Sequence, residues 1–190
     1  MVKEGDFVRI KYEGFADGKK FDENEVMIIV GAGHVIRGLE KALIGKKVGE
    51  EFEVDIEPKD GFGERSEKLV RIIPRGVFKR EGVNPVPGMT VNVDNLVGKI
   101  VSVGGRVVVD FNHPLAGKKL HYKVRILKVV KGKGEKLKGL FKFHTGREGR
   151  VEGNQIFYEG EVPELVKRRI FEDAKRWLGV KELLFTQVWK

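Results

Sequence analysis

Short apolar runs separated by glycine-containing turns dominate the first 130 residues. Valine and isoleucine are frequent in these runs and partly alternate with polar residues, which is typical of half-buried β-strands. The clearest hairpin joins residues 101–103 to 107–109 through Gly104 and Gly105, a pair that tolerates the positive φ angles of a tight turn. The pattern predicts a mainly β (α+β) fold. The runs interpreted as strands are VRIKYEG (8–14), MIIVGAG (27–33), FEVDIEP (52–58), TVNVDN (90–95), KIVSVGG (99–105), RVVVDF (106–111) and HYKVRILKVV (121–130).

Two segments carry good helix signals. One is short, covers about residues 36–44, and ends at Gly45. The other covers residues 163–178, begins with proline and ends at Gly179. The apolar side chains of this second helix fall on one face and are Leu165, Val166, Ile170, Ala174, Trp177 and Leu178.

A series of motifs runs in a fixed order through the first 127 residues. They are IKYEG (10–14), DGKKFD (17–22), Gly31, VIRGLEKAL (35–43), VGE (48–50), PKDGFG (58–63) and LHYKVRIL (120–127). In this order they resemble the motifs of FKBP-type peptidyl-prolyl cis–trans isomerases. The resemblance covers about two thirds of the chain, and it implies an antiparallel sheet with one short helix.

About fifty residues separate the last two of these motifs, where ordinary FKBP domains have only a short flap. With VVDFNHPLAG (108–117) before the final strand, the chain resembles the SlyD-like branch and its long archaeal members, in which a small β domain is inserted in the flap. This resemblance implies an isomerase domain at 1–65 and 110–130, an insert-in-flap chaperone domain at 66–109, and a C-terminal domain at 135–190.

Rotation about an X-Pro amide has a barrier of ~18–20 kcal/mol and can limit folding. A catalyst must bind the twisted imide more tightly than either planar form, and this requires no nucleophile, metal or cofactor. We therefore expect no cofactor. The resemblance implies catalytic roles for Tyr12, Asp22, Ile36, Phe62 and Tyr122, and substrate binding by Phe21, Val26, Val35, Leu39 and His113.

The roles of these residues follow from the resemblance. Tyr12 would place its hydroxyl at the pocket wall, and Asp22 would contact the turning carbonyl or hold Tyr12. The backbone N–H of Ile36 would receive a peptide carbonyl at the start of its helix, where such donors are unpaired. Without the resemblance, Tyr12 is more simply a half-buried strand residue, Asp22 a turn residue and the apolar side chains ordinary core. His113 is better explained as part of a turn near the pocket rim than as a catalytic base.

Three positions depart from the family pattern. Leu39 stands where many eukaryotic members have a tryptophan, Phe62 replaces a tyrosine, and Tyr122 replaces a phenylalanine. The first two changes remove a stacking surface and a hydroxyl donor, and should weaken tight macrolide binding. The pocket stays apolar, so we expect isomerisation to persist.

The insert invites two interpretations, capture of unfolded chains by adding them to a sheet edge, or a purely structural lid. The resemblance favours capture, with unfolded or proline-containing polypeptides as clients. The chain would then be an isomerase with chaperone activity; the alternative is a holdase chaperone without significant isomerase activity.

The segment after the Gly/Lys-rich residues 131–136, which we interpret as a linker, resembles a β-α-β unit built from 150–159, the helix and 182–189. Such a unit buries little core alone. Its aromatic residues exceed what it can easily hide, and we expect it to pack on another domain or subunit; a homodimer through this domain and client binding both stay open. These aromatic residues are Phe157, Trp177, Phe185 and Trp189.

The chain has 190 residues and no cysteine, which excludes disulfides and thiolate chemistry. No apolar run approaches the roughly 20 residues of a membrane span, and the N-terminus lacks the apolar segment of a signal peptide. We therefore expect a cytoplasmic protein without a membrane partner. The histidines at 34, 121 and 144 have no ligand spacing, so we expect no dedicated metal site.

Charge is the remaining signal, with 37 lysine and arginine residues against 28 acidic ones and a net charge of +9. The expected isomerase domain is neutral overall, so the excess lies in the insert and the C-terminal segment. Nucleic acid is one acidic partner, but no nucleic-acid motif is present, and Glu172 and Asp173 interrupt the basic face of the second helix. We expect no nucleic-acid partner, and encounter with unfolded chains is the more plausible use of the charge.

Overall fold

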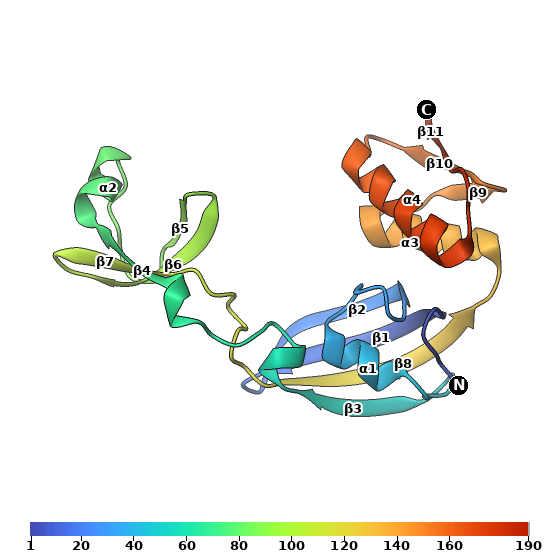
Figure 1. The fold of residues 1–190 in the computed structure, drawn as a ribbon, viewed down its shortest axis with the longest axis horizontal. Helices are drawn as coiled ribbons and strands as arrows, with labels where there is room; N and C mark the ends of the chain where they lie inside the picture. The colour runs from blue at the N-terminus through green and yellow to red at the C-terminus, as the bar shows by residue number, and fades with distance from the viewer. Residues whose placement is uncertain (190) are drawn as a thin grey trace.

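The computed structural model describes residues 1–189, which form a central sheet domain, a projecting insert and a C-terminal unit (Figure 1). The central sheet is antiparallel with the order β2-β1-β8-β3, so β8 lies between β1 and β3. The expected mainly β fold and the short helix are confirmed. The elements of this domain are β1 (Phe7–Ala16), β2 (Lys19–Ile29), α1 (Arg37–Leu43), β3 (Glu51–Ile56), the 3₁₀ turn η1 (Pro58–Asp60) and β8 (Leu120–Val130).

Alternation along β1 decides which face of the sheet receives α1. Val8, Ile10 and Tyr12 are buried, and they share a core with Leu39 and Leu43 of α1. Because successive side chains of a strand point to opposite faces, this alternation sends the intervening polar residues of β1 outward. The sheet therefore has one apolar face under α1, and the opposite face is charged along the part of β1 from Arg9 to Glu13.

The insert is a second antiparallel sheet, with the order β4-β7-β6-β5, and it extends away from the central sheet (Figure 1). The expected hairpin at 101–109 is confirmed, whereas β4 and α2 were not expected from the sequence. Its core is small and consists of Ile73, Phe78, Ile100, Val107, Val109 and Phe111. The elements are η2 (Glu67–Leu69), β4 (Val70–Pro74), α2 (Arg75–Arg80), β5 (Thr90–Val93), β6 (Leu96–Val103) and β7 (Arg106–Asp110).

The turns of the insert differ from the expectation in one respect. Gly104 and Gly105, expected to use their freedom at positive φ, both lie outside the left-handed region. Asp94 (φ 52°) and Asn95 (φ 62°) occupy it instead, between β5 and β6. Two successive residues at positive φ match a type I′ hairpin turn, in which aspartate and asparagine are tolerated.

Polar contacts tie together the two chain segments that lead into and out of the insert. Asn112 accepts a hydrogen bond from the Ser66 backbone N–H over 2.8 Å and donates to the Ser66 carbonyl over 2.9 Å. Arg65 pairs with Asp110 over 2.7 Å. The insert is thus joined to the sheet domain through two adjacent, cross-linked segments.

The C-terminal unit contains the expected β-α-β crossover and an additional helix. Strands β10 and β11 are parallel, and α4 lies between them in the chain. The linker expected at 131–136 is wrong from Lys133 onward, because α3 begins there, and the domain start expected at 135 falls inside this helix. The glycines and lysines favoured a linker. The residues that follow them nevertheless include an apolar i, i+3, i+4 pattern at 137, 140 and 141, and all three are buried. The elements are α3 (Lys133–Thr145), β9 (Arg150–Glu152), β10 (Gln155–Glu159), α4 (Glu164–Leu178) and β11 (Leu184–Val188).

The C-terminal unit packs on the central sheet. This is one of the two arrangements expected from its sequence, namely packing on another domain or on another subunit. Phe7, Met27, Ile29 and Val130 of the sheet share a second core with α3, α4 and β10. Gly139 allows the close approach of α3, because a Cβ atom at this position would overlap the side chain of Met27. The sheet is therefore buried on both faces at this end, while the insert leaves from the opposite end of β8.

The aromatic residues of this unit have different environments. Trp177 and Phe185 pack against the second core, and Arg150 lies over the ring of Phe157 at 4.4 Å. Trp189 is 81% exposed. The homodimer stays a prediction. No helix within residues 1–189 combines the length and the apolar character needed to cross a membrane.

Candidate active site

Tyr12 and Asp22 form the polar end of the candidate site. Tyr12 pairs with Asn24 across the β1–β2 ladder, and Asp22 is two residues from Asn24, so both side chains are on the same face. The Tyr12 hydroxyl donates a hydrogen bond to Asp22 Oδ2 over 3.0 Å. Asp22 is therefore more than a turn residue, because its side chain holds the phenol of Tyr12 in position.

A continuous series of rings leads away from this hydrogen bond. Tyr12 contacts Tyr122 with ring centroids 5.8 Å apart, and Tyr122 meets the edge of Phe21 at 5.9 Å. Phe21 in turn lies 6.1 Å from Phe62, which stacks on His113 at 4.4 Å. We call these five residues the ring series. They come from β1, β8, β2, the segment after η1 and the segment after the insert, so the fold brings together positions far apart in the chain.

Aliphatic residues complete the apolar surroundings. Val26, Val35 and Ile36 are partly buried against the same core, and Leu39 is fully buried within it. All ten residues implied by the resemblance thus belong to the ring series, bond to it or pack on the core that it shares, while their individual roles stay predictions. Among the described residues, the backbone N–H of Ile36 has no hydrogen-bond acceptor, and its carbonyl accepts the first bonds of α1.

The two phenols of the site are held in the neutral form. Burial raises the pKa of Tyr12 well above its ordinary value of 10, and the hydrogen bond to Asp22 and its negative charge act in the same direction. Burial, followed by the charge of Asp22, raises the pKa of Tyr122 to about 12. Both hydroxyls are consequently protonated and able to donate hydrogen bonds at neutral pH.

The sequence did not single out two residues that shape the site. Gly14 lies beneath Phe21 and Tyr122, and a Cβ atom there would lie 2.9–3.0 Å from their rings. Leu115, two residues after His113, packs against the same core. A glycine inside a strand pattern is a recognised sign of such close approach and could have identified Gly14.

A surface depression of about 530 Å³ near Tyr12 belongs to the other face of the sheet. Its lining is mainly charged, with Glu13, Glu51 and Lys123 among the residues. Exposed charged residues alternate there with the buried residues of the strands, as expected for a solvated outer face. An apolar proline ring would pack more favourably against the ring series than against the charged lining of this depression.

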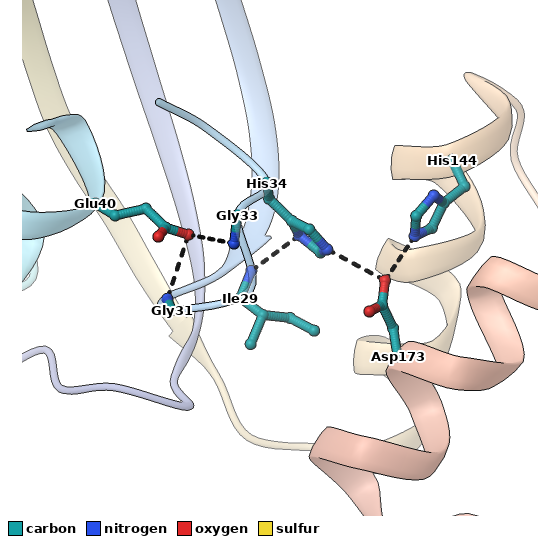
Figure 2. Close-up of polar contacts among 7 residues, drawn as sticks. All are labelled: Ile29, Gly31, Gly33, His34, Glu40, His144 and Asp173. Carbon is teal, nitrogen blue, oxygen red and sulfur yellow. Dashed lines mark hydrogen bonds and ion pairs between the residues drawn. The ribbon is translucent and has the colours of Figure 1, made fainter. Parts of the chain in front are cut away.

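A second cluster lies outside the ring series. His34, between β2 and α1, converges with His144 of α3 and Asp173 of α4 (Figure 2). Sequence spacing gave no sign of this, because the three residues lie far apart in the chain and His34 reaches the other two only across the contact with the C-terminal unit.

Comparison with known proteins matches both the insert and the chain as a whole. A family model described as "FKBP26, IF domain" matches residues 71–115, which contain the insert sheet. The chain is 35% identical over 154 residues to a short-type peptidyl-prolyl cis-trans isomerase of Methanocaldococcus jannaschii, a match that covers 71% of this chain and 98% of that protein.

Bacterial relatives match a shorter part. The SlyD FKBP-type peptidyl-prolyl cis-trans isomerase of Haemophilus influenzae is 42% identical over 103 residues, covering 51% of this chain and 53% of that protein. A probable FKBP-type 16 kDa peptidyl-prolyl cis-trans isomerase of Pseudomonas fluorescens is 36% identical over 114 residues, covering 57% of this chain and 75% of that protein. This chain therefore spans about half the length of the Haemophilus relative and nearly all of the archaeal one.

Proposed function

The chain belongs to the FKBP-type peptidyl-prolyl cis–trans isomerase family, in its SlyD-like branch, and on this premise we propose that it isomerises X-Pro bonds of unfolded or partly folded polypeptides. Membership makes it an enzyme of the isomerase class. The observation that carries the proposal is the ring series, an apolar arrangement that ends at the hydrogen bond between Tyr12 and Asp22.

The proposed mechanism is non-covalent. Twisting the X-Pro imide removes amide resonance, so the carbonyl oxygen loses negative polarisation as the barrier is approached. Apolar ring faces exclude the water that would stabilise the more polar planar form. The carboxylate of Asp22, close to the turning carbonyl, disfavours the polarised planar form more than the twisted one. Each 1.36 kcal/mol of such differential stabilisation accelerates the rotation about tenfold.

The remaining residues bind and orient the peptide. The ring of the substrate proline rests among Phe21, Phe62 and Tyr122, and the Ile36 N–H receives a carbonyl of the bound chain. Since Tyr12 is neutral and already donates to Asp22, its part is to fix that carboxylate rather than to transfer a proton.

Isomerisation of a prolyl tetrapeptide by the intact protein tests this proposal. Phe62→Ala should lower kcat/KM by roughly tenfold, because one wall of the apolar site is lost. Phe157→Ala, an aromatic substitution in β10 outside the ring series, is the matched control and should leave kcat/KM unchanged. Unmeasurable activity of the unaltered chain would contradict the proposal and favour the holdase alternative.

We also propose that the insert captures unfolded chains. The face of its sheet that points away from its core carries Ile72, Val97 and Val101, which are 61%, 66% and 52% exposed. Exposed apolar residues on a small sheet with free edges suit hydrophobic capture and strand addition.

A surface variant tests capture without removing the insert. Replacing Ile72, Val97 and Val101 together by serine should slow catalysed refolding of a proline-limited protein and leave tetrapeptide isomerisation unchanged. Lys99→Ser, an exposed change on the same strand as Val101, is the control. Refolding as fast in the triple variant as in the unaltered chain would refute capture by this face.

A further inference from the structure

The contact between the sheet domain and the C-terminal unit includes a mostly buried polar cluster. His34 Nε2 lies 3.2 Å from Asp173 Oδ2, and His144 Nε2 lies 2.7 Å from the same oxygen (Figure 2). The side chains of His34, Asp173 and His144 are 6%, 22% and 15% exposed. A carboxylate from α4 thus holds one histidine of its own unit and one of the sheet domain.

The backbone decides which nitrogen of His34 carries the proton. The Ile29 N–H donates to His34 Nδ1 over 3.2 Å, so Nδ1 must offer its lone pair. A neutral imidazole then has its hydrogen on Nε2, the nitrogen that faces Asp173. The bond between the two domains is consequently a His34 Nε2–H donating to a carboxylate, which is a charge-assisted hydrogen bond.

The same tautomer argues against a divalent metal in this cluster, although the three side chains resemble a ligand set. A metal at His34 Nε2 requires the lone pair of that nitrogen and moves the hydrogen to Nδ1. That hydrogen would point at the Ile29 N–H, so two donors would face each other. The hydrogen-bonded cluster satisfies both ring nitrogens of His34 without this conflict.

His34 lies in the segment that connects β2 to α1, and this segment is held from two sides. On one side, the Glu40 carboxylate of α1 accepts hydrogen bonds from the N–H groups of Gly33 at 2.9 Å and Gly31 at 3.3 Å (Figure 2). On the other side, the His34 ring stacks on Phe143 of α3 at 4.1 Å and reaches Asp173. The next two residues are Val35 and Ile36 of the candidate site.

We propose that Asp173 is a positioning residue of the prolyl site: through His34, the C-terminal unit fixes the segment that presents Val35 and Ile36 to the substrate. This inference rests on the proposed function. Asp173 touches no substrate; it raises the fraction of molecules whose binding segment is already in the competent conformation. Apparent affinity for substrate scales with that fraction.

The expected kinetic consequence is specific. Removing the carboxylate should raise KM for a prolyl peptide roughly three- to tenfold and change kcat less than twofold, because the bound state reorders the segment. A merely structural role would instead reduce the amount of folded protein and leave KM of the folded fraction unchanged.

The experiment uses the full chain with Asp173→Ala and two matched controls. Glu172→Ala removes a negative charge at the adjacent exposed position of α4. Glu135→Gln removes the charge from another contact between the same two domains, the Lys128–Glu135 pair at 3.2 Å, which involves no residue of the segment. Only Asp173→Ala should raise KM and speed hydrogen–deuterium exchange of residues 30–36. Unchanged exchange and KM would overturn the proposal, as would equal effects in Glu135→Gln.

Further variants keep the proposal falsifiable if Asp173→Ala folds poorly. Asp173→Asn retains an oxygen that can accept from His34 Nε2–H and should recover part of the KM loss. His34→Asn keeps a short acceptor for the Ile29 N–H but cannot reach Asp173, and should reproduce the effect of Asp173→Ala. Exchange is measured without turnover, so an unaltered chain with no isomerase activity would refute the proposed function, while exchange still reports on the coupling. A rise in melting temperature with added Zn²⁺ that His34→Asn abolishes would overturn the hydrogen-bonded assignment.

Discussion

The imidazole of His113 lies 4.4 Å from the ring of Phe62 and within 3° of parallel to it. Phe62 precedes the insert in the chain and His113 follows it, so this contact closes the base of the insert at the end of the ring series. The turn expected around His113 therefore packs directly against Phe62 of the candidate site.

His113→Ala should lower kcat/KM for a prolyl tetrapeptide about three- to tenfold. Stacked rings contribute about 0.5–1.5 kcal/mol, and Phe62 would lose its support on one face. His113→Phe keeps a flat ring and should retain most of the activity. Equal losses in the two variants would show that the imidazole acts through its nitrogens, for instance by accepting the Leu115 N–H over 3.1 Å.

Tyr12→Phe removes the hydrogen bond to Asp22 and should lower kcat/KM about threefold to thirtyfold, because a bond to a charged group contributes about 1.5–3 kcal/mol and Asp22 is partly solvated. The fold should persist, as checked by circular dichroism. Tyr122→Phe is the comparison, since Tyr122 has no hydrogen bond to lose among the described residues.

The raised phenol pKa values predict the behaviour of the enzyme at alkaline pH. Neither Tyr12 nor Tyr122 ionises in the folded chain near its ordinary value of 10, so activity should be flat between about pH 7.5 and 9.5. The unfolded chain ionises first, so the stability tied to these phenols is fully present below pH 10 and is lost as the pH rises towards 12. A fall in activity below pH 9 would contradict the assignment of neutral phenols.

Burial lowers the pKa of His34 below its ordinary value of 6.5, although the hydrogen bond to Asp173 and its charge oppose the shift. The nearby His144 acts with burial, whereas the charge of Glu40 opposes it. The folded chain therefore binds this proton less readily than the unfolded chain. The associated stability is present above about pH 6.5 and is lost as the pH falls through the lowered value. Urea unfolding between pH 7.5 and 5.5 should show a smaller loss for His34→Asn than for the unaltered chain.

Two glycines of α3 offer a matched pair of substitutions. Gly139→Ala should destabilise the chain by about 1–3 kcal/mol, because the added methyl group overlaps Met27. Gly134→Ala has open space around its Cβ position and should stabilise α3 by up to about 1 kcal/mol. Thermal unfolding of both variants measures the difference. A Gly139→Ala chain as stable as Gly134→Ala would show that α3 and β2 are less closely packed.

The homodimer expected through the C-terminal domain can be tested by sedimentation of the full chain. Trp189→Ser removes the most exposed aromatic side chain of this unit and should weaken a dimer that uses it. A monomer for the unaltered chain at high concentration would remove the dimer prediction. Truncation at residue 131 is a poor control, because it would expose Phe7, Met27, Ile29 and Val130.

Local patterns predicted the parts of the fold that depend on neighbours in sequence. Helix α4 follows from its proline start, its glycine end and its apolar face, and the structure bears these out from Pro163 to Gly179, except that Leu165 of the expected face is 61% exposed. Helix α3 was missed because Gly132 and Gly134, with the lysines beside them, resemble a flexible linker. A glycine is required at position 139 only because β2 packs closely against α3. This is a tertiary contact, and the pattern of residues along the chain carries no sign of it.

The site divides in the same way. The order of the motifs identified Asp22 and the ring series, which includes Tyr12, because a shared fold fixes where those residues lie. The contact of His34 with Asp173 had no such signal, since it spans 139 positions and depends on how a separate unit docks. Comparison with sequences of the sheet domain alone therefore cannot identify residues, such as His34, whose partners belong to the C-terminal unit.

The central place of β8 gives the insert a role during biosynthesis. Strands β1 and β3 both need β8 as a hydrogen-bonding neighbour, yet β8 is made only after the whole insert has been translated. Strands β4 to β7 can pair first, and their closing contacts bring Leu69 within a 2.9 Å hydrogen bond of Phe111. A prefolded insert shortens the free loop between β3 and β8, and loop closure becomes less costly as that loop shortens. The module proposed to hold other unfolded chains should therefore also speed the folding of the domain that carries it.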